Sequence, residues 1–319
     1  MPPFPQPAFN FDFDPDAEVT ALRQWRDTQP GRAIPDKHDG RLLLGSWNIA
    51  NLGDSGQVRD ARDLPLMAEI LGWFDIIALQ EVKENLGDLM KIKAMMPGYD
   101  VVLSDQTGNG ERMVFLYDAT RVNRLALVGE IDISPKDQRH IKIPNSTQKF
   151  TGFDRAPYMV AFEKDGFVLT VVNVHLFFGS SSQRSINRRA LETYAVGRWG
   201  DLRRKRGRAF SHNLVVIGDM NMPVADVGDE VFEALTKRGL HIPEHQSRIG
   251  TTITEGKHYD QLAFFPGDAG TAYVQDGVFD FDGAVFADLW DTRTEKEFEA
   301  FVRYHLSDHR PIWVQFRTD

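Results

Sequence analysis

The chain has 319 residues, of which 42% are hydrophobic, which is enough for one large core or two modest domains. It has no cysteine, which excludes disulfides, thiolate metal sites and a cysteine nucleophile, so any metal ion must be held by oxygen or imidazole ligands. The net charge of −9 opposes binding to a polyanion, and a phosphate-bearing partner would require a local basic patch or a bound cation. Because the chain has neither a long apolar span nor a signal-peptide pattern, we expect a cytoplasmic protein without membrane contact.

The first 40 residues are rich in proline and aspartate and predict one helix, from about Asp16 to Asp27. We expect residues 1–40 to be an extension packed on a single main domain, residues 41–319. In that domain, eight short apolar runs predict strands, and polar residues lie at their ends. The runs are 42–47, 76–79, 113–117, 159–162, 168–174, 214–217, 261–265 and 311–316.

Helical spacing of apolar residues predicts further helices between these strands. They are expected at 64–74, 85–95, 191–202 and 229–238. Strands and helices mixed in this order predict an α+β fold in which two packed β-sheets have helices on their outer faces.

The tetrapeptide Gly218-Asp219-Met220-Asn221 closes the apolar run 214–217, so a carboxylate and a carboxamide project from the end of a buried strand. Oxygen ligands of this kind suit Mg²⁺ or Mn²⁺. Asp and Asn also end strands by bonding to their own backbone. By itself, the motif therefore allows either a structural turn or part of a site.

Phosphodiester hydrolysis requires a cation, a positioned water, a proton donor and positive groups around the phosphate. Each polar strand end, taken alone, is also compatible with an ordinary strand terminus or a satisfied core residue. Together they supply ligand oxygens on Asn48 and Glu81, imidazoles on His175 and His309, and carboxylates on Glu111 and Asp260 that can orient an imidazole.

Eight motifs occur along the chain: Trp47-Asn48-Ile49, Leu79-Gln80-Glu81-Val82, Glu111-Arg112, Arg155-Ala156-Pro157, Asn173-Val174-His175, Gly218-Asp219-Met220-Asn221, Tyr259-Asp260 and Ser307-Asp308-His309-Arg310-Pro311. In this order they resemble the motifs of the endonuclease/exonuclease/phosphatase superfamily, above all its deoxyribonuclease I branch. The resemblance runs from about residue 42 to 316. It implies a four-layer α/β-sandwich of two mixed sheets flanked by helices. It also implies one catalytic domain over residues 41–319 that cleaves a phosphate ester with a divalent cation.

The resemblance assigns a role to each matched position. Asn48 and Glu81 resemble the first metal site, and Asp308 resembles a further ligand. Asp219 and Asn221 resemble the residues that place the attacking water or hold a second ion. Mg²⁺ or Mn²⁺ is the expected cofactor, with Ca²⁺ as a further candidate.

The catalytic pairs follow from the same resemblance. His175 with Glu111, and His309 with Asp260, resemble two carboxylate–imidazole pairs that exchange acid and base roles among the members. Arg155 resembles the phosphate-binding arginine, and we take Asn173 with it as a substrate-binding residue.

A basic cluster lies between Gln183 and Arg208, where nine basic residues accompany two acidic ones and leave a local charge of +7. Such a cluster is either a solvated helix face or a phosphate-contacting surface. Arg184, Arg188 and Arg189 are the better candidates for substrate binding, because they follow His175 through the glycine- and serine-rich segment 179–182.

The substrate is less sharply indicated. Ala50 and Gly108-Asn109-Gly110 stand where deoxyribonuclease I has residues that face the DNA minor groove. The first hypothesis is a deoxyribonuclease I-like nuclease that uses in-line water attack on phosphorus, with DNA rather than RNA as the expected partner. The alternatives are a phosphatase or phosphodiesterase for a small-molecule or lipid phosphate ester, and an inactive binding module.

Overall fold

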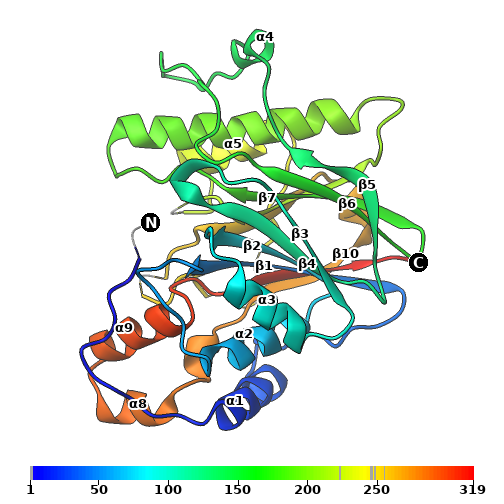
Figure 1. Cartoon of the computed structure of the whole chain (residues 1–319). Coiled ribbons are helices and arrows are strands. Elements are labelled where there is room, and N and C mark those ends of the chain that lie inside the picture. The colour runs from blue at the N-terminus through cyan, green and yellow to red at the C-terminus, as the bar shows by residue number, and fades with distance from the viewer. Residues whose placement is uncertain (1–2, 223, 245–246, 248, 255) are drawn as a thin grey trace.

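The computed structural model describes residues 3–222, 224–244, 247, 249–254 and 256–319, and two mixed sheets lie at its centre (Figure 1). The order of the first sheet is β10 (Tyr273–Val278), β11 (Ile312–Arg317), β1 (Arg41–Leu52), β2 (Ile76–Val82), β4 (Arg112–Asp118) and β3 (Tyr99–Leu103). The order of the second sheet is β5 (Asn123–Glu130), β6 (Tyr158–Lys164), β7 (Phe167–His175), β8 (Asn213–Asp219) and β9 (Asp260–Phe264).

Helices cover the outer faces of both sheets, with α1, α2, α8 and α9 on one side and α5 on the other (Figure 1). The helices beside the first sheet are α1 (Pro15–Thr28), α2 (Asp63–Gly72), α3 (Gly87–Met95), α8 (Ala287–Thr292) and α9 (Glu295–His305). On the second sheet lie α5 (Gln183–Arg204) and α6 (Glu230–Thr236), and the short helices are α4 (Pro135–Gln138) and α7 (Asp268–Ala272). None of the helices among the described residues is long and apolar enough to cross a membrane.

Alternation along the strands explains the layers. In β8, Val215 and Ile217 enter the core between the two sheets, whereas Leu214 and Val216 pack toward α5 and α6. Since both faces of this strand are covered, its sequence is a continuous run of branched apolar residues. Three apolar cores in this arrangement separate four layers, as the sequence predicted.

All eight predicted strands are present, and the described residues form three more, β3, β5 and β10. Each of these three is an edge strand of its sheet. No residue of β5 is buried, so it lacks the apolar run by which the buried strands were recognised. The helices α8 and α9 were also missed, although Thr294 and Glu297 form a capping box at the start of α9.

The N-terminal residues pack on the first sheet's helices. Phe13 contacts Phe286 and Phe301 edge to face, and Trp25 of α1 donates a hydrogen bond from Nε1 to Asp280 Oδ1 at 2.8 Å. The treatment of residues 1–40 as an extension of one main domain stays a prediction.

Strand direction positions the polar strand ends. Strand β1 runs parallel to β2, and β7 runs parallel to β8, so four carboxyl ends share one end of the sandwich. Strands β4, β9 and β11 run antiparallel to β2, β8 and β1, which brings their amino ends to the same place.

At the opposite end, Asp75 joins the two sheets. Its buried carboxylate accepts a hydrogen bond from the Leu43 backbone N–H at 2.8 Å. It also pairs with Lys164 Nζ at 3.1 Å and with Arg121 Nε at 2.9 Å. Because Lys164 ends β6 of the second sheet, this ion pair links the sheets directly.

We expect Asp75→Ala to lower the free energy of unfolding by about 3–5 kcal/mol, because it leaves the buried ammonium of Lys164 unpaired. Denaturant unfolding followed by circular dichroism measures this. The control is Asp12→Asn, an exposed carboxylate, for which the change should stay within about 0.5 kcal/mol. Equal effects of the two substitutions would contradict the account of Asp75.

Candidate functional site

The first part of the site consists of two bulged strand ends. The pairing of β1 with β2 shifts register between Asn48 and Leu52, and Glu81 adopts a positive φ of 61°. Such strain in a non-glycine residue is typical of functional sites. Asn48 Nδ2 lies 3.1 Å from Glu81 Oε1 and 3.2 Å from Asp219 Oδ2, so it bridges the two sheets.

The tetrapeptide 218–221 forms the turn after β8. Gly218 has a φ of 136°, and a Cβ there would lie 2.2 Å from the carbonyl oxygen of Val174. Asp219 Oδ1 accepts the Asn221 backbone N–H at 2.9 Å, and Asn221 Nδ2 donates to the Leu176 carbonyl at 2.8 Å. The motif is therefore a backbone-bonded turn whose side chains also line a cavity.

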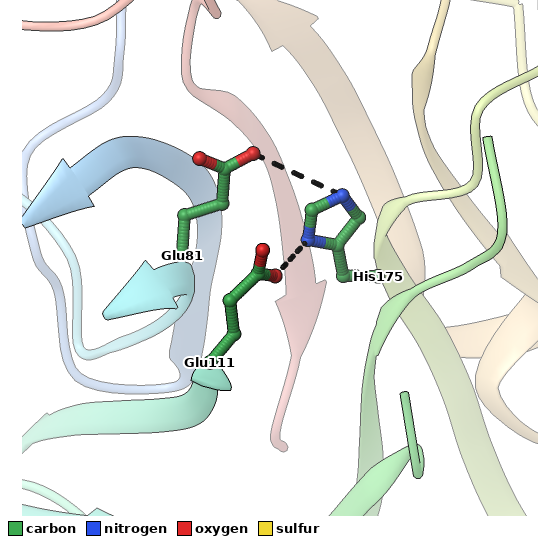
Figure 2. A group of neighbouring side chains, drawn as sticks. All are labelled: Glu81, Glu111 and His175. Atoms are coloured by element: carbon green, nitrogen blue, oxygen red, sulfur yellow. Dashed lines mark ion pairs between the residues drawn. The ribbon is translucent and has the colours of Figure 1, made fainter. Parts of the chain in front are cut away.

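His175, the last residue of β7, lies between carboxylates from the other sheet (Figure 2). Its Nδ1 is 2.9 Å from Glu111 Oε2, and its Nε2 is 3.9 Å from Glu81 Oε1 and 3.4 Å from Asp219 Oδ2. Burial opposes the ionisation of Glu111, but the imidazole of His175, together with the nearby cations Arg155 and Lys83, outweighs it and lowers the pKa of that carboxyl. Glu111 thus orients the ring so that Nε2 faces Asp219.

His309 forms the second carboxylate–imidazole pair. Its Nδ1 is 2.7 Å from Asp260 Oδ2, and its Nε2 is 3.9 Å from Asp219 Oδ2. Burial works against the charged ring, but the carboxylates of Asp260 and Asp308 raise the pKa of His309 well above its ordinary value. Burial also opposes the ionisation of Asp219, yet the two imidazoles lower the pKa of its carboxyl.

Asp308 lies near two other carboxylates, Glu81 and Asp219. Burial raises the pKa of its carboxyl, and Glu81 and Asp219 raise it further against the opposing effect of His309. Its Oδ1 atom is buried and has no hydrogen-bond partner within the described part of the chain. Next to it, the Ser307 hydroxyl donates to the Asn48 carbonyl at 2.6 Å, which joins this segment to β1.

These groups face a cavity of about 610 Å³. Among the predicted site residues, six line it: Arg155, His175, Asp219, Asn221, Asp308 and His309. Four lie directly behind its wall, fully or almost fully buried: Asn48, Glu81, Glu111 and Asp260. Two groups of possible metal ligands converge here, Glu81 with Glu111 and His175, and Asp219 with Asp260 and His309.

The predicted substrate-binding residues are placed differently. Arg155 donates from Nε and Nη2 to the carbonyls of His175 and Leu176, at 2.8 and 2.7 Å. Asn173 is fully buried, and its Nδ2 donates to the Leu79 and Val114 carbonyls of the first sheet. Neither side chain of Arg184 or Arg188 lines the 610 Å³ cavity, and both line a neighbouring one. The substrate contacts of these four residues stay predictions.

Several supporting residues had no signal in the sequence. Lys83 Nζ pairs with Glu111 Oε1 at 3.1 Å, and Thr251 Oγ1 accepts the Asp260 backbone N–H at 3.1 Å. Arg59 is buried and donates to the carbonyls of Ile49, Ala50, Tyr304 and Leu306. Only the fold brings these segments together, because their partners lie on other strands and helices.

Glu192 of α5 anchors two residues of the cavity wall. Its carboxylate accepts the backbone N–H of Asp154 at 3.1 Å and that of Phe177 at 3.0 Å. Burial raises the pKa of Glu192 to about 7, although these N–H groups and Arg188 favour the ionised form.

No family model matches the chain. A curated deoxyribonuclease from Thioalkalivibrio sp. (strain K90mix) is 23% identical over 305 residues, which cover 90% of this chain and 73% of that protein.

Among solved structures, an endonuclease/exonuclease/phosphatase family protein from Bacteroides thetaiotaomicron superposes with a TM-score of 0.57 at 18% identity, over 88% of this chain and 95% of that one. The chain has the endonuclease/exonuclease/phosphatase fold. D. rerio TDP2 complexed with single-strand DNA product gives a TM-score of 0.55 at 17% identity, over 88% of this chain and 100% of that one. The resemblance and the fold class predicted from the sequence are confirmed.

We expect Gly218→Ala to lower the free energy of unfolding by at least about 2 kcal/mol, because the new Cβ collides with the Val174 carbonyl at a positive φ. The matched control is Gly207→Ala, since a Cβ there meets nothing within 4 Å. Thermal unfolding of both variants tests this. A Gly218→Ala protein as stable as the control would contradict the close approach of β7 to this turn.

Glu192 makes the stability of the fold depend on pH. Since the pKa of Glu192 is raised from 4.5 to about 7, its stabilising contribution is complete below pH 4.5 and is lost as the pH rises through 7. Glu192→Gln removes this dependence, so the free energy of unfolding of the wild type should fall by about 2–3 kcal/mol more than that of the variant over this range. Urea unfolding at a series of pH values measures the difference. The control is Glu233→Gln, an exposed position, for which the free energy of unfolding should vary with pH as it does in the wild type. If the Glu192→Gln variant also showed the pH dependence of the wild type, the raised pKa would not belong to Glu192.

Proposed function

We propose that the chain is a divalent-metal-dependent phosphodiester hydrolase that acts as a nuclease. One observation carries the proposal: two imidazoles, each oriented by a buried carboxylate, direct Nε2 toward the same oxygen of Asp219, at 3.4 and 3.9 Å. A carboxylate between two oriented imidazoles is suited to proton transfer on both sides of a phosphate.

Asn48, Glu81 and Asp308 would hold a hard cation, Mg²⁺ or Mn²⁺. Three features support the fit: all three residues offer oxygen ligands, Asp308 Oδ1 has no hydrogen-bond partner in the described chain, and burial together with the charges of Glu81 and Asp219 raises the pKa of the Asp308 carboxyl. Asn48 directs Nδ2 toward Glu81 and Asp219, and its Oδ1 accepts the Ala50 backbone N–H at 3.1 Å, so coordination through Oδ1 would require the amide to turn and give up that hydrogen bond. When bound, such an ion neutralises phosphoryl oxygens and favours departure of the ester oxygen.

The protein's own groups would move the protons. Asp219, held ionised by the two imidazoles, can accept a proton from the attacking water. Asn221, whose amide is oriented by the Leu176 carbonyl, can position that water from the cavity wall. His309 is held protonated and can donate from Nε2 to the leaving oxygen, while His175 Nε2 can bind a phosphoryl oxygen.

DNA is the substrate that we favour. The curated relative is named a deoxyribonuclease, and D. rerio TDP2 is described with a single-strand DNA product. In this chain, Phe178 and Tyr259 line the cavity with ring centroids 6.1 Å apart and offer aromatic faces to an unstacked base.

We expect Mn²⁺ or Mg²⁺ to support cleavage of plasmid and single-stranded DNA, and EDTA to abolish it. Asp219→Asn and His309→Gln should each lower kcat by about 10²–10⁴, because each removes a proton-transfer group. Cleavage is measured on labelled DNA, on RNA and on small phosphate mono- and diesters. The exposed Asp226→Asn serves as the control and should keep full activity.

Three results would count against the proposal. Full activity of Asp219→Asn would contradict the site itself. Activity confined to phosphate monoesters would favour a phosphatase. Metal binding without turnover of any substrate would favour a binding module.

A further inference from the structure

A second cavity, of about 700 Å³, adjoins the candidate site. It lies between residues 145–152 and the first three turns of α5, where the segment between α4 and β6 runs past that helix (Figure 1). The two cavities share Phe177 as a wall. A volume of this size is within the range of ~300–1,000 Å³ that holds small ligands, such as a nucleotide.

The lining of this cavity is basic on an acidic chain. Lys149, Arg184 and Arg188 are its cationic residues, and Glu192 is the one acidic residue among the described residues that line it. The buried Glu192 carboxylate accepts the backbone N–H groups of Asp154 and Phe177 and pairs with Arg188 Nε at 3.4 Å, so it offsets the charge of Arg188 but not the charges of Lys149 and Arg184. Local cations of this kind attract a phosphate backbone in spite of the net charge.

The cations differ in how they are held. Arg188 stacks over the Phe177 ring at 4.1 Å and pairs with Asp154 Oδ1 at 3.0 Å, so it is fixed at the border between the two cavities. Within the described part of the chain, neither Lys149 nor Arg184 forms an ion pair. Their charges are therefore available to an incoming anion.

The remaining lining supplies mainly neutral hydrogen-bonding groups. Amide and hydroxyl side chains, among them Asn145, Gln148, Ser185 and Asn187, surround the cations. Phe150, also part of the lining, is almost fully buried in the core and packs against Phe153. Cations and neutral donors are the groups that bind the phosphates and sugars of a single strand.

We propose that this second cavity binds the nucleotides that flank the scissile phosphate, so that the substrate is a polynucleotide strand rather than a mononucleotide or a small ester. The inference rests on the proposed function, because it takes the neighbouring 610 Å³ cavity as the place of cleavage. The strand passes from that cavity across Phe177 and Arg188 into the second one, where Lys149 and Arg184 neutralise its next phosphates.

The test compares one long and one short substrate. With Mn²⁺, kcat/KM is measured for a single-stranded DNA of ~20 nucleotides and for bis(p-nitrophenyl) phosphate. In the Lys149→Glu/Arg184→Glu variant, the ratio of the two values, long over short, should fall at least about tenfold. The salt dependence of DNA binding should also become shallower, by about 0.7 in the logarithmic slope for each lost phosphate contact.

A matched control makes the same charge change elsewhere. Arg203→Glu/Arg206→Glu alters one cation in the last turn of α5 and one just beyond its end, neither of which lines either cavity, and should leave the ratio unchanged. An equal fall in both double variants would overturn the proposal, because it would show only a general effect of charge. An unchanged ratio in Lys149→Glu/Arg184→Glu would overturn it as well.

Binding separates this inference from the proposed function. Anisotropy of the labelled DNA in EDTA should show at least tenfold weaker binding to Lys149→Glu/Arg184→Glu, and inorganic phosphate should compete poorly if the ligand is a strand. If the wild type hydrolyses neither substrate, the proposed function fails and this binding result still decides the role of the cavity. Should the double variant not fold, the single Lys149→Gln variant is tested in the same way, with about a threefold effect expected.

Discussion

The parallel pairing of β7 with β8 is the constraint on which the candidate site depends, because it sets His175 directly beside Asp219 in the ladder. The antiparallel pairing of β8 with β9 then places Asp260 on the other side of Asp219. A slip of one residue in either pairing would turn these side chains to the opposite face of the sheet. The pairing of β7 with β8 requires glycine at position 218, since any Cβ there would clash with the Val174 carbonyl of β7.

Both sheets contribute charged groups to the site, so packing of the two sheets completes it. Glu81 and Glu111 come from the first sheet, and His175 and Asp219 come from the second. Burying these groups is costly unless each is paired. The ion pairs of His175 with Glu111 and of His309 with Asp260 reduce this cost, whereas Asp308 keeps an excess of negative charge beside it. A bound cation would neutralise this excess of negative charge around Asp308.

Helix α5 connects the site to the second cavity. Through Glu192 it anchors the backbone of Asp154 and Phe177, the residues at the border between the two cavities. Through Arg184 and Arg188 it presents cations beside that border. The basic cluster seen in the sequence thus divides in space, because a helix of 22 residues carries its first turns to the site and its last turns to the far end.

The sequence by itself determined the buried strands and the residues at their ends, because branched apolar runs and the polar residues that close them are local patterns. The motif at Gly218–Asn221 was visible in this way, but the motif alone did not show whether it is only a structural turn or also part of a site. Edge strands such as β5 lacked an apolar signal, and Lys83, Arg59 and Glu192 had no local signal at all. The family resemblance proposed which carboxylate pairs with which imidazole, and the structure brings those same pairs together. Only the tertiary structure decided which arginines line which cavity and which residues support the site, because those contacts join residues far apart in the chain, from different strands, sheets and loops.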